Sequence, residues 1–345
     1  MQRLIVNVIA IFSISFSSVT HPIVPVPAAD QSEPIAITGA VIHIGNGMIV
    51  NDGIITFDRG LITAVGVAGG GINLVNHALI DVEGRHVYPG FVLPNSTLGL
   101  IEVNSVRATS DVLEEGDINA SVRSAIAYNT DSEIIPANRF NGILTAQVAP
   151  QGGLISGSST VFKLDGWNWE DAALKSDDGI HLNWPSSFHQ SGWWAEPGTI
   201  KENEKYNERI TQLKSFFKKA TAYANSSSLM DLQMESMKGL FNGSKTLYIH
   251  ANNASDMLDA IDFADNFEIT KTVIVGAEDA LKITDILKEN NIALILNRVH
   301  RLPNSEDDPV DDPFTQAAKL QEAGVLFCLS YEGDMEAMGA RNLPF

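Results

Sequence analysis

From about residue 88 to its end, the chain alternates short apolar segments of strand character with amphipathic segments of helical character. Consecutive parallel strands need a crossover of a dozen or more residues, usually a helix, so this alternation predicts a parallel sheet covered by helices. Eight such strands are enough to close into a (β/α)₈ TIM-like barrel, an α/β fold. The strands that we expect are 87–93, 143–148, 160–164, 180–183, 246–250, 272–275, 293–296 and 325–329.

The helices of this pattern are clearest in the second half of the chain, where apolar residues recur with a period of about 3.6. No helix is well marked after the first strand, and residues 151–200 are expected to form an elaborated loop region. All five tryptophans lie between residues 167 and 194, either as an aromatic wall beside a substrate or, as we favour, in a long loop with its own core. The expected helices are 201–225, 254–266, 279–290 and 315–323.

The first ninety residues have a different organisation. Residues 30–87 contain short alternating segments interrupted by GNG, NDG and DRG, which are hairpin signals, and we expect a small β-sandwich module there. Residues 1–29 fit a secretory signal peptide, with Arg3 followed by an apolar stretch; a buried N-terminal helix is the alternative. The apolar stretch is too short to span a bilayer. We therefore expect a secreted or periplasmic protein without stable membrane insertion.

Composition limits the classes of partner. The formal net charge of −19 disfavours nucleic acid, because neutralising a phosphate backbone requires clustered Lys and Arg. Cys328 is the only cysteine, so no disulfide can form within the chain, and its apolar surroundings GVLFCLS predict a packed core thiol. A small-molecule substrate and further copies or other protein chains, in a homo- or hetero-oligomer, remain as partners.

Several stretches carry a resemblance to a known family. The run IAITGAVIHIGNGMIVNDGIITFDRGLITAVG followed by IDVEGRHVYPGFV resembles the entry into amidohydrolase-superfamily proteins, especially imidazolonepropionase-like ones. The runs LYIHANN, VIVGAEDALKITDILKENNIALIL and EAGVLFCLSYEGD are similar to barrel strands five to eight of that group. The resemblance implies a β-sandwich leading into a barrel at 88–345, and hydrolysis of a non-peptide carbon–nitrogen bond. The family's last helix and its return to the sandwich have no counterpart, so we expect a fragment of a longer protein.

The resemblance also implies a metal centre, from which this sequence departs. The family ends strand one with His-x-His, two ligands of a divalent, zinc-like metal that activates water; here the positions are Asn95 and Thr97, which we expect to contact substrate. His250 matches the family's metal ligand on strand five, and His181 lies near the bridging position of strand four. A packed histidine or a substrate contact is the alternative for each. The strand-six histidine is missing, so we expect a reduced or rebuilt site around His250 and Glu332.

Other candidates lie at the expected barrel mouth. Glu332 and Asp334, after strand eight, are the best remaining source of a general base, or else exposed acids of a turn. Arg298 and His300, after strand seven, are expected to contact substrate, since a guanidinium can hold a carboxylate with two hydrogen bonds. The Gly- and Ser-rich run 148–159 matches neither a phosphate-binding loop nor a nucleophile elbow, and we expect turns there.

Two hypotheses of function follow. The first is an exported amidohydrolase-like hydrolase with a reduced or rebuilt metal site. The second is a catalytically inactive binding or partner subunit of the same fold, which the replacement of imidazoles by Asn-Ser-Thr suggests. Fold alone does not decide between them, whereas the metal content of the protein would.

Overall fold

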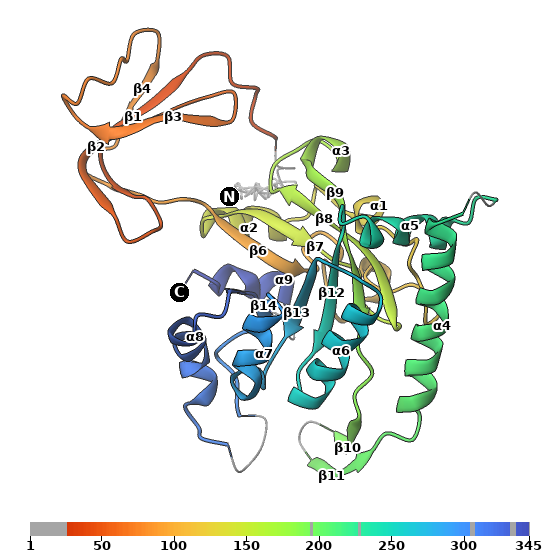
Figure 1. Ribbon diagram of the computed structural model, residues 1–345. Helices are drawn as coiled ribbons and strands as arrows, with labels where there is room; N and C mark the ends of the chain where they lie inside the picture. The colour runs from red at the N-terminus through yellow and green to blue at the C-terminus, as the bar shows by residue number, and fades with distance from the viewer. Residues whose placement is uncertain (1–25, 194–195, 227–228, 304–307, 332–335, 345) are drawn as a thin grey trace, which may run out of the picture.

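The largest element of the protein is an eight-stranded sheet that curls into a nearly closed barrel (Figure 1). The strand order is β15-β14-β13-β12-β9-β8-β7-β6, and the hydroxyl of Ser330, just after β15, donates a hydrogen bond to the carbonyl of Pro94 in β6 at 2.7 Å. The strands are β6 (Phe91–Ser96), β7 (Ile143–Val148), β8 (Ile155–Lys163), β9 (Ala173–Asn183), β12 (Thr246–Ala251), β13 (Thr272–Gly276), β14 (Ala293–Leu296) and β15 (Phe327–Leu329). The computed structural model describes residues 26–193, 196–226, 229–303, 308–331 and 336–344.

One strand departs from the predicted parallel barrel. Strand β8 is antiparallel to both β7 and β9, and it begins at Ile155, inside the run that the sequence analysis expected to form turns. The connection from β7 to β8 is too short for a crossover helix, so the chain has to reverse direction. The small residues of this run allow close packing: a Cβ on Gly157 would lie 2.5 Å from the carbonyl oxygen of Val122. The purely parallel (β/α)₈ arrangement was therefore wrong, and the sheet is mixed.

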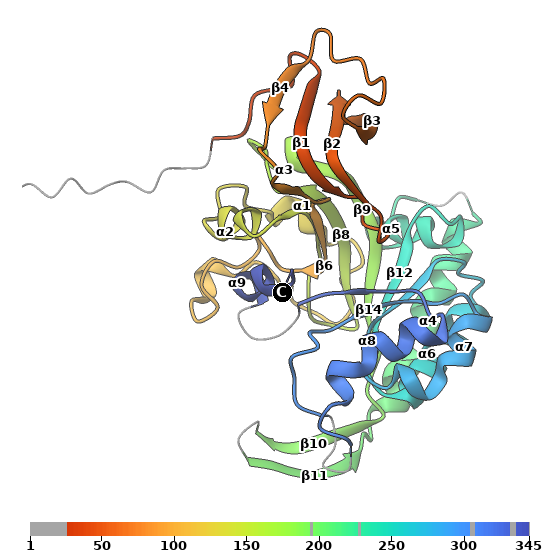
Figure 2. The same cartoon turned by 90° about the vertical axis from the view of Figure 1, so that its left-hand side faces the viewer.

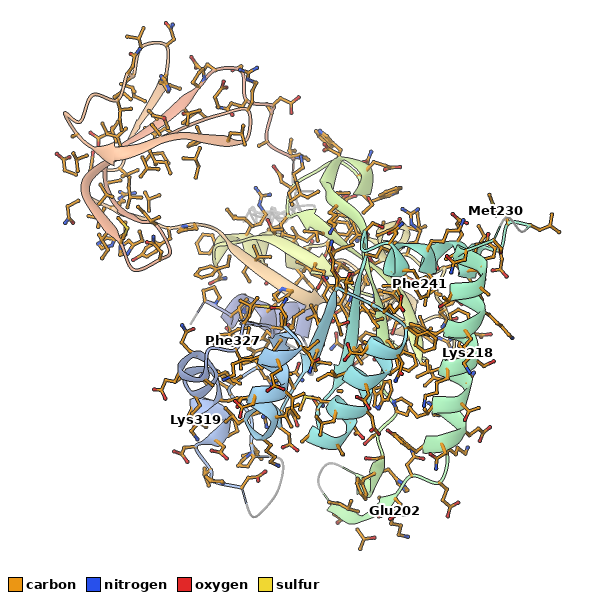
Figure 3. All side chains as sticks on the ribbon, in the orientation of Figure 1. Glu202, Lys218, Met230, Phe241, Lys319 and Phe327 are labelled. Carbon is orange, nitrogen blue, oxygen red and sulfur yellow. The ribbon has the colours of Figure 1, made fainter. Side chains whose placement is uncertain are left out.

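Long helices cover the side of the barrel made by β9 and β12–β15, as Figures 1 and 2 show. The residues between helices and sheet form the main core, in which Phe217, Phe263 and Phe267 contact one another with ring centroids 4.8–5.3 Å apart. In Figure 3, Lys218 and Lys319 mark exposed positions on two of these helices. The helical elements are α4 (Tyr206–Ala224), α5 (Leu232–Phe241), α6 (Ala254–Asn266), η2 (Ala280–Ile283), α7 (Thr284–Glu289) and α8 (Asp312–Ala323).

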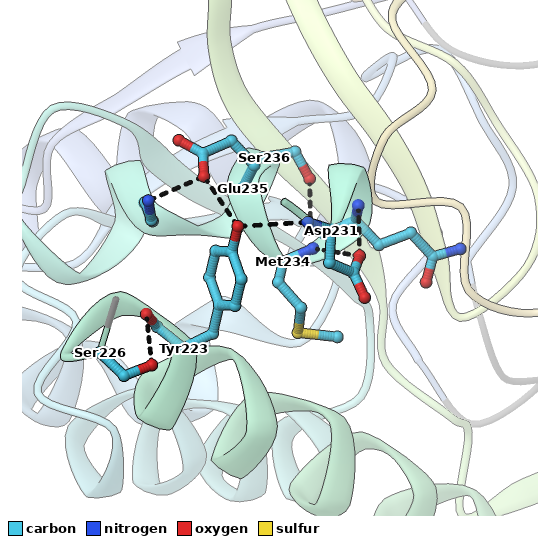
Figure 4. Close-up of polar contacts among 8 residues, drawn as sticks. Tyr223, Ser226, Asp231, Met234, Glu235 and Ser236 are labelled. Carbon is cyan, nitrogen blue, oxygen red and sulfur yellow. Dashed lines mark hydrogen bonds and ion pairs between the residues drawn. The ribbon is translucent and has the colours of Figure 1, made fainter. Parts of the chain in front are cut away.

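Helices α4 and α5 both differ from the sequence prediction. The predicted helix 201–225 begins at Tyr206, because the residues before it form a hairpin of β10 (Phe188–Trp193) and β11 (Glu196–Glu202). Helix α5 was not predicted. Its signal is Asp231, whose carboxylate accepts hydrogen bonds from the N–H groups of Gln233 and Met234 and so caps the helix. The hydroxyl of Tyr223 on α4 joins the two helices by donating to Glu235 at 3.1 Å (Figure 4).

The side of the barrel made by β6–β8 has short helices and a core of its own. In this core the rings of Tyr128 and Phe162 stack with centroids 3.8 Å apart. Burial raises the pKa of the Tyr128 phenol, which keeps the hydroxyl protonated at neutral pH. The helices are η1 (Arg107–Thr109), α1 (Ser124–Ala127), α2 (Ile134–Phe140), α3 (Trp169–Ala172), α9 (Glu336–Gly339) and η3 (Ala340–Asn342).

The N-terminal module is a five-stranded sheet at the end of the molecule opposite to the β10–β11 hairpin (Figures 1 and 2). Hairpins join β1 to β2 and β2 to β3, as the turn signals predicted, whereas β4 and β5 pair with β1 in parallel. The described residues of the module form one sheet and not the two packed sheets of a sandwich. Its strands are β1 (Ile35–His43), β2 (Ile49–Asp58), β3 (Leu61–Val67), β4 (Ala78–Asp81) and β5 (His86–Val87).

Two further predictions concern single features. Cys328 is exposed and does not lie in the core, because β15 is the last strand of the sheet and its neighbours Leu326 and Leu329 are exposed as well. Residues 1–25, most of the predicted signal peptide, lie outside the described residues. Among the residues that are described, no helix combines the length and apolar character needed to cross a membrane.

Candidate functional site at the barrel mouth

A cavity of about 470 Å³ lies where four neighbouring barrel strands end. The loops at the carboxyl ends of barrel strands carry the functional residues in folds of this type, so this cavity is the candidate site. Asn183 ends β9, His250 lies near the end of β12, Gly276 ends β13 and Asn297 follows β14. We call it the mouth cavity; it is lined by Asn183, Trp184, Ser186, His250, Ala251, Asn252, Asn253, Asp256, Val275, Gly276, Glu278 and Asn297.

The structure brings the two predicted metal ligands together below the mouth cavity. Strands β9 and β12 are neighbours, and Nδ1 of His181 lies 2.9 Å from Nε2 of His250, a hydrogen-bond distance. The His181 ring is fully buried and stacks on Tyr248 with centroids 4.7 Å apart. Burial lowers the pKa of His250 to about 4 and lowers the pKa of His181 well below its usual value, with the neighbouring His250 adding to the second shift. Both imidazoles are therefore neutral at pH 7, one donating the shared proton and the other accepting it.

This pair does not fit the zinc-like centre that the resemblance implied. One nitrogen of each imidazole is engaged by the other ring, whereas a ligand nitrogen must point its lone pair at the metal. A catalytic zinc site needs three protein ligands, and the described part of the chain contains no group of three His, Cys, Asp or Glu side chains arranged to hold a metal. Glu332 and Asp334, the predicted catalytic acids, lie outside the described residues, so their roles stay predictions.

Asn95 and Thr97 lie at the carboxyl end of β6 and are buried, with exposed fractions of 9% and 1%. Asn95 has a left-handed backbone (φ +48°), and its N–H donates to Oε1 of Gln147 at 3.1 Å. The Thr97 hydroxyl is buried and has no hydrogen-bond partner among the described residues. Neither side chain belongs to the lining of the mouth cavity, so their predicted contact with substrate stays a prediction.

A buried polar network lies behind these residues. Asp178 accepts hydrogen bonds from the Tyr248 hydroxyl at 2.6 Å and from Nε2 of Gln147 at 3.0 Å, and its other oxygen lies 2.6 Å from Nζ of Lys175. Burial, with the Asp178 charge beside it, raises the pKa of Tyr248. The network therefore connects the strained backbone of Asn95 on one side of the barrel with the ring under His181 on the other. The sequence analysis did not find it.

The predicted contacts after strand seven do not reach the mouth cavity. Arg298 is half-buried, and His300 is exposed with its ring centroid 5.9 Å from that of Phe314. Neither lines the cavity, although Asn297, directly before them, does.

The tryptophans also divide between two places. Trp184 is buried, lines the cavity and packs edge-on against Phe263, whereas Trp169 lies under the Arg123 guanidinium on the β6–β8 side. They therefore do not form one wall, and the favoured interpretation, residues held by local cores, agrees with these two positions. Trp194 and the Trp193 side chain lie outside the described residues.

The sequence analysis missed three amides of the site, Asn183, Asn252 and Asn253. The signal is present in the runs GIHLNWP and YIHANN, where a buried strand ends directly in asparagine. Residues in this position face the mouth of a barrel. The two carboxylates of the cavity, Asp256 and Glu278, follow on the next loop or helix turn and have no comparable signal.

Comparison with known proteins supports the fold. No protein-family model matches the chain, and no curated protein does either. The solved structure of an amidohydrolase from Thermotoga maritima is similar, with a TM-score of 0.71 and 21% sequence identity, covering 88% of this chain and 80% of that one. Molinate hydrolase (TM-score 0.48, 13% identity, 86% of this chain and 72% of that one) and an adenosine deaminase from Xanthomonas campestris with bound zinc (0.41, 12%, 89% and 71%) are more distant. The chain thus shares the fold of the Thermotoga amidohydrolase.

Proposed function

We propose that the protein is a hydrolase that acts on a carbon–nitrogen bond of a small molecule bound in the mouth cavity. The observation that carries the proposal is the position of that cavity, at the carboxyl ends of β9, β12, β13 and β14 in a fold similar to an amidohydrolase. A cavity of about 470 Å³ with amide, imidazole and carboxylate groups is large enough for a small polar substrate.

The described residues supply binding and orientation in this proposal. His250 presents a neutral imidazole to the cavity, and His181 holds its Nε2 in place from below. A divalent metal, if bound, would activate the attacking water, but the described residues do not form its ligand set. A rebuilt centre in which His250 works with Glu332 or Asp334 belongs to the proposal, as do export of the protein and a sandwich completed around the N-terminal sheet.

The test is hydrolysis by the purified full chain, assayed with N-acyl amino acids, cyclic amides and cyclic ureas, with metal content measured on the same sample. We expect release of amine or ring opening that falls about a hundredfold in His250→Gln, since misplacing a bound substrate by about 1 Å can cost about a hundredfold in rate. His300→Gln is the matched control, because that exposed imidazole lies outside the cavity. Equal loss in both variants, or no turnover with any class, would contradict the proposal.

One observation favours a second candidate, a binding protein without catalysis. The hydrogen bond between His181 and His250 engages one nitrogen of each imidazole with the other ring and not with a metal. Metal-free protein that binds a small molecule in the mouth cavity without converting it would establish this second function.

A further inference from the structure

We infer that the outer edge of strand β10 is a docking edge for a second copy of this chain. In this arrangement the β10 strands of two copies pair antiparallel about a two-fold axis, and their hairpins form one four-stranded sheet. The inference goes beyond the proposed function, because it concerns an interaction surface and requires no catalysis. It rests on the hairpin of β10 and β11, which the sequence analysis did not predict.

The hairpin lies past the mouth end of the barrel, beyond the ends of the covering helices in Figures 1 and 2. Its two strands form a sheet of their own, and among the described residues neither strand pairs with any strand but the other. An isolated two-stranded hairpin is at best marginally stable in water, whereas a sheet of three or more strands can be stable. A hairpin in this position therefore gains stability from a further strand.

The base of the hairpin is held in place by hydrogen bonds. The N–H and the hydroxyl of Ser187 both donate to Oδ1 of Asp256 on α6, at 3.2 and 2.7 Å. Asn203, after β11, donates from its N–H to the carbonyl of Ser187 at 2.9 Å and from Nδ2 to the carbonyl of Ser186 at 2.8 Å. The hairpin is therefore preorganised, which lowers the entropic cost of binding a partner.

The outer edge of β11 is protected against pairing. Natural edge strands avoid pairing with other chains through charged side chains, proline and bulges, and β11 has all three. Pro197 has no N–H to donate, and Lys201 is an exposed charge. Between Ile200 and Pro197 the chain also takes one residue more than the facing part of β10, which is a bulge.

Strand β10 has none of these protections. Its sequence, FHQSGW, contains no Asp, Glu, Lys, Arg or Pro. In an antiparallel pair the backbone groups of each strand point alternately towards and away from the partner, so half of those in β10 point outwards. In a chain with a net charge of −19, an uncharged strand allows two copies to meet without placing like charges opposite each other. The same strand of a second copy matches this edge, because a two-fold axis pairs a strand with itself in the antiparallel direction.

One face of the hairpin also exposes apolar side chains. Phe188 is paired with Glu202, and Ile200 lies two residues from Glu202, so Phe188 and Ile200 share a face. Their side chains are exposed by 46% and 69%. A second β10 strand would bring another Phe188 to this face and would bury apolar surface that one hairpin leaves in water.

The pairing joins two strands of six residues, fewer than the roughly 20–30 residues a side of a standard interface. We therefore expect a weak dimer, with a dissociation constant on the order of 10–100 μM. Sedimentation velocity of the full chain over a range of concentrations measures it. A chain that remains monomeric up to about 500 μM, well above that range, would overturn the inference.

A pair of variants assigns the contact to β10. Phe188→Lys faces Glu202 within the hairpin, so the hairpin keeps a favourable cross-strand pair while each docking edge gains a like charge. We expect it to raise the dissociation constant at least about tenfold, because like charges across an interface are strongly unfavourable. Ile200→Lys is the matched control, since it adds the same charge on the same face but on β11, and it should change the constant less than about threefold.

Equal weakening by Ile200→Lys and Phe188→Lys would refute the assignment to the β10 edge. Hydrogen exchange of the unmodified protein tests the pairing without any substitution. The amides of β10 should exchange at least about tenfold more slowly at concentrations where the dimer predominates, because their N–H groups become hydrogen-bonded. A dimer in which the exchange of β10 is unchanged would also refute the inference. A failure of the proposed function appears only in the turnover assay and leaves these measurements unaffected.

Discussion

The two sides of the barrel differ in regularity although they belong to one sheet. The side made by β9 and β12–β15 is parallel and covered by the helices α4–α8, and it carries the mouth cavity. The side made by β6–β8 contains an antiparallel strand, short helices and long irregular connections. Each side has a packed core, since Phe217 on the first and Phe162 on the second are both fully buried. Regular secondary structure and a well-packed core are therefore separate properties in this protein.

The largest effect that we expect tests whether the two cores are equally important. Phe217→Ala and Phe162→Ala should each lower the free energy of unfolding by about 3–5 kcal/mol, because each leaves a cavity in a packed core. Urea denaturation followed by circular dichroism measures both. Phe140→Ala, at a ring that is 93% exposed, is the control and should change stability by less than about 0.5 kcal/mol. A cost under about 1 kcal/mol for Phe162→Ala would show that the irregular side contributes little.

The next effect concerns the network that joins the two sides. Tyr248→Phe removes the hydroxyl that donates to Asp178 and leaves a buried carboxylate with one donor fewer, so we expect a loss of about 1–3 kcal/mol. Tyr223→Phe removes two exposed hydrogen bonds, one donated to Glu235 and one accepted from the N–H of Asp231, and should cost less than about 0.5 kcal/mol. If Tyr248→Phe and Tyr223→Phe lowered the free energy of unfolding equally in the same denaturation experiment, the network would not stabilise the contact between the two sides of the barrel.

The pH dependence of stability tests the side of the barrel that carries the mouth cavity. His250 has a pKa of about 4 in the folded protein, below the ordinary histidine value of about 6.5, so the unfolded chain binds protons first as the pH falls. Stability should be complete above about pH 6.5 and should fall by about 1.5 kcal/mol towards pH 5 on account of this residue. His250→Gln should lose that part of the slope, whereas His300→Gln should keep it. Parallel pH profiles for the wild type and His250→Gln would rule out a buried neutral imidazole.

The smallest change in stability that we expect is at the end of β6. Thr97→Val replaces a buried hydroxyl that has no partner among the described residues, so stability should stay the same or rise by up to about 1 kcal/mol. Thr160→Val, whose hydroxyl accepts a hydrogen bond from the N–H of Asp177, should cost about 0.5–1.5 kcal/mol in the same assay. Destabilisation by Thr97→Val would show that the hydroxyl is satisfied in the folded protein.

Several elements of the regular side could be predicted from the sequence in detail. Strand β14 and helix α6 have the predicted bounds 293–296 and 254–266, and β12 differs by one residue. In these segments the spacing of apolar residues follows the period of the element, because one face packs against the core. On the other side, β7 has its predicted bounds, whereas β8 overlaps the predicted strand 160–164 only in its last residues, since residues 156–160 are Ser, Gly and Thr and carry no apolar pattern.

The site could be predicted only in part, because its contacts join residues far apart in the sequence. His250 was placed correctly at a strand end, but its partner is 69 residues away and is set by the register of β9 and β12. The pairing of Tyr248 with Asp178, 70 residues apart, depends on the same register. The chain alternates faces along each strand, so an error of one residue would have removed both contacts.

Gly276, the last residue of β13, limits how this mouth can change. Its backbone is left-handed (φ +95°), and a Cβ placed there would collide with Oδ1 of Asn252. Engineering an imidazole into this position, as a step towards a metal-dependent enzyme, would require the neighbouring amide to move and the backbone to change at the same time. Any side chain at this position would be strained by the left-handed backbone, so a designer would introduce the substitution together with a change at Asn252.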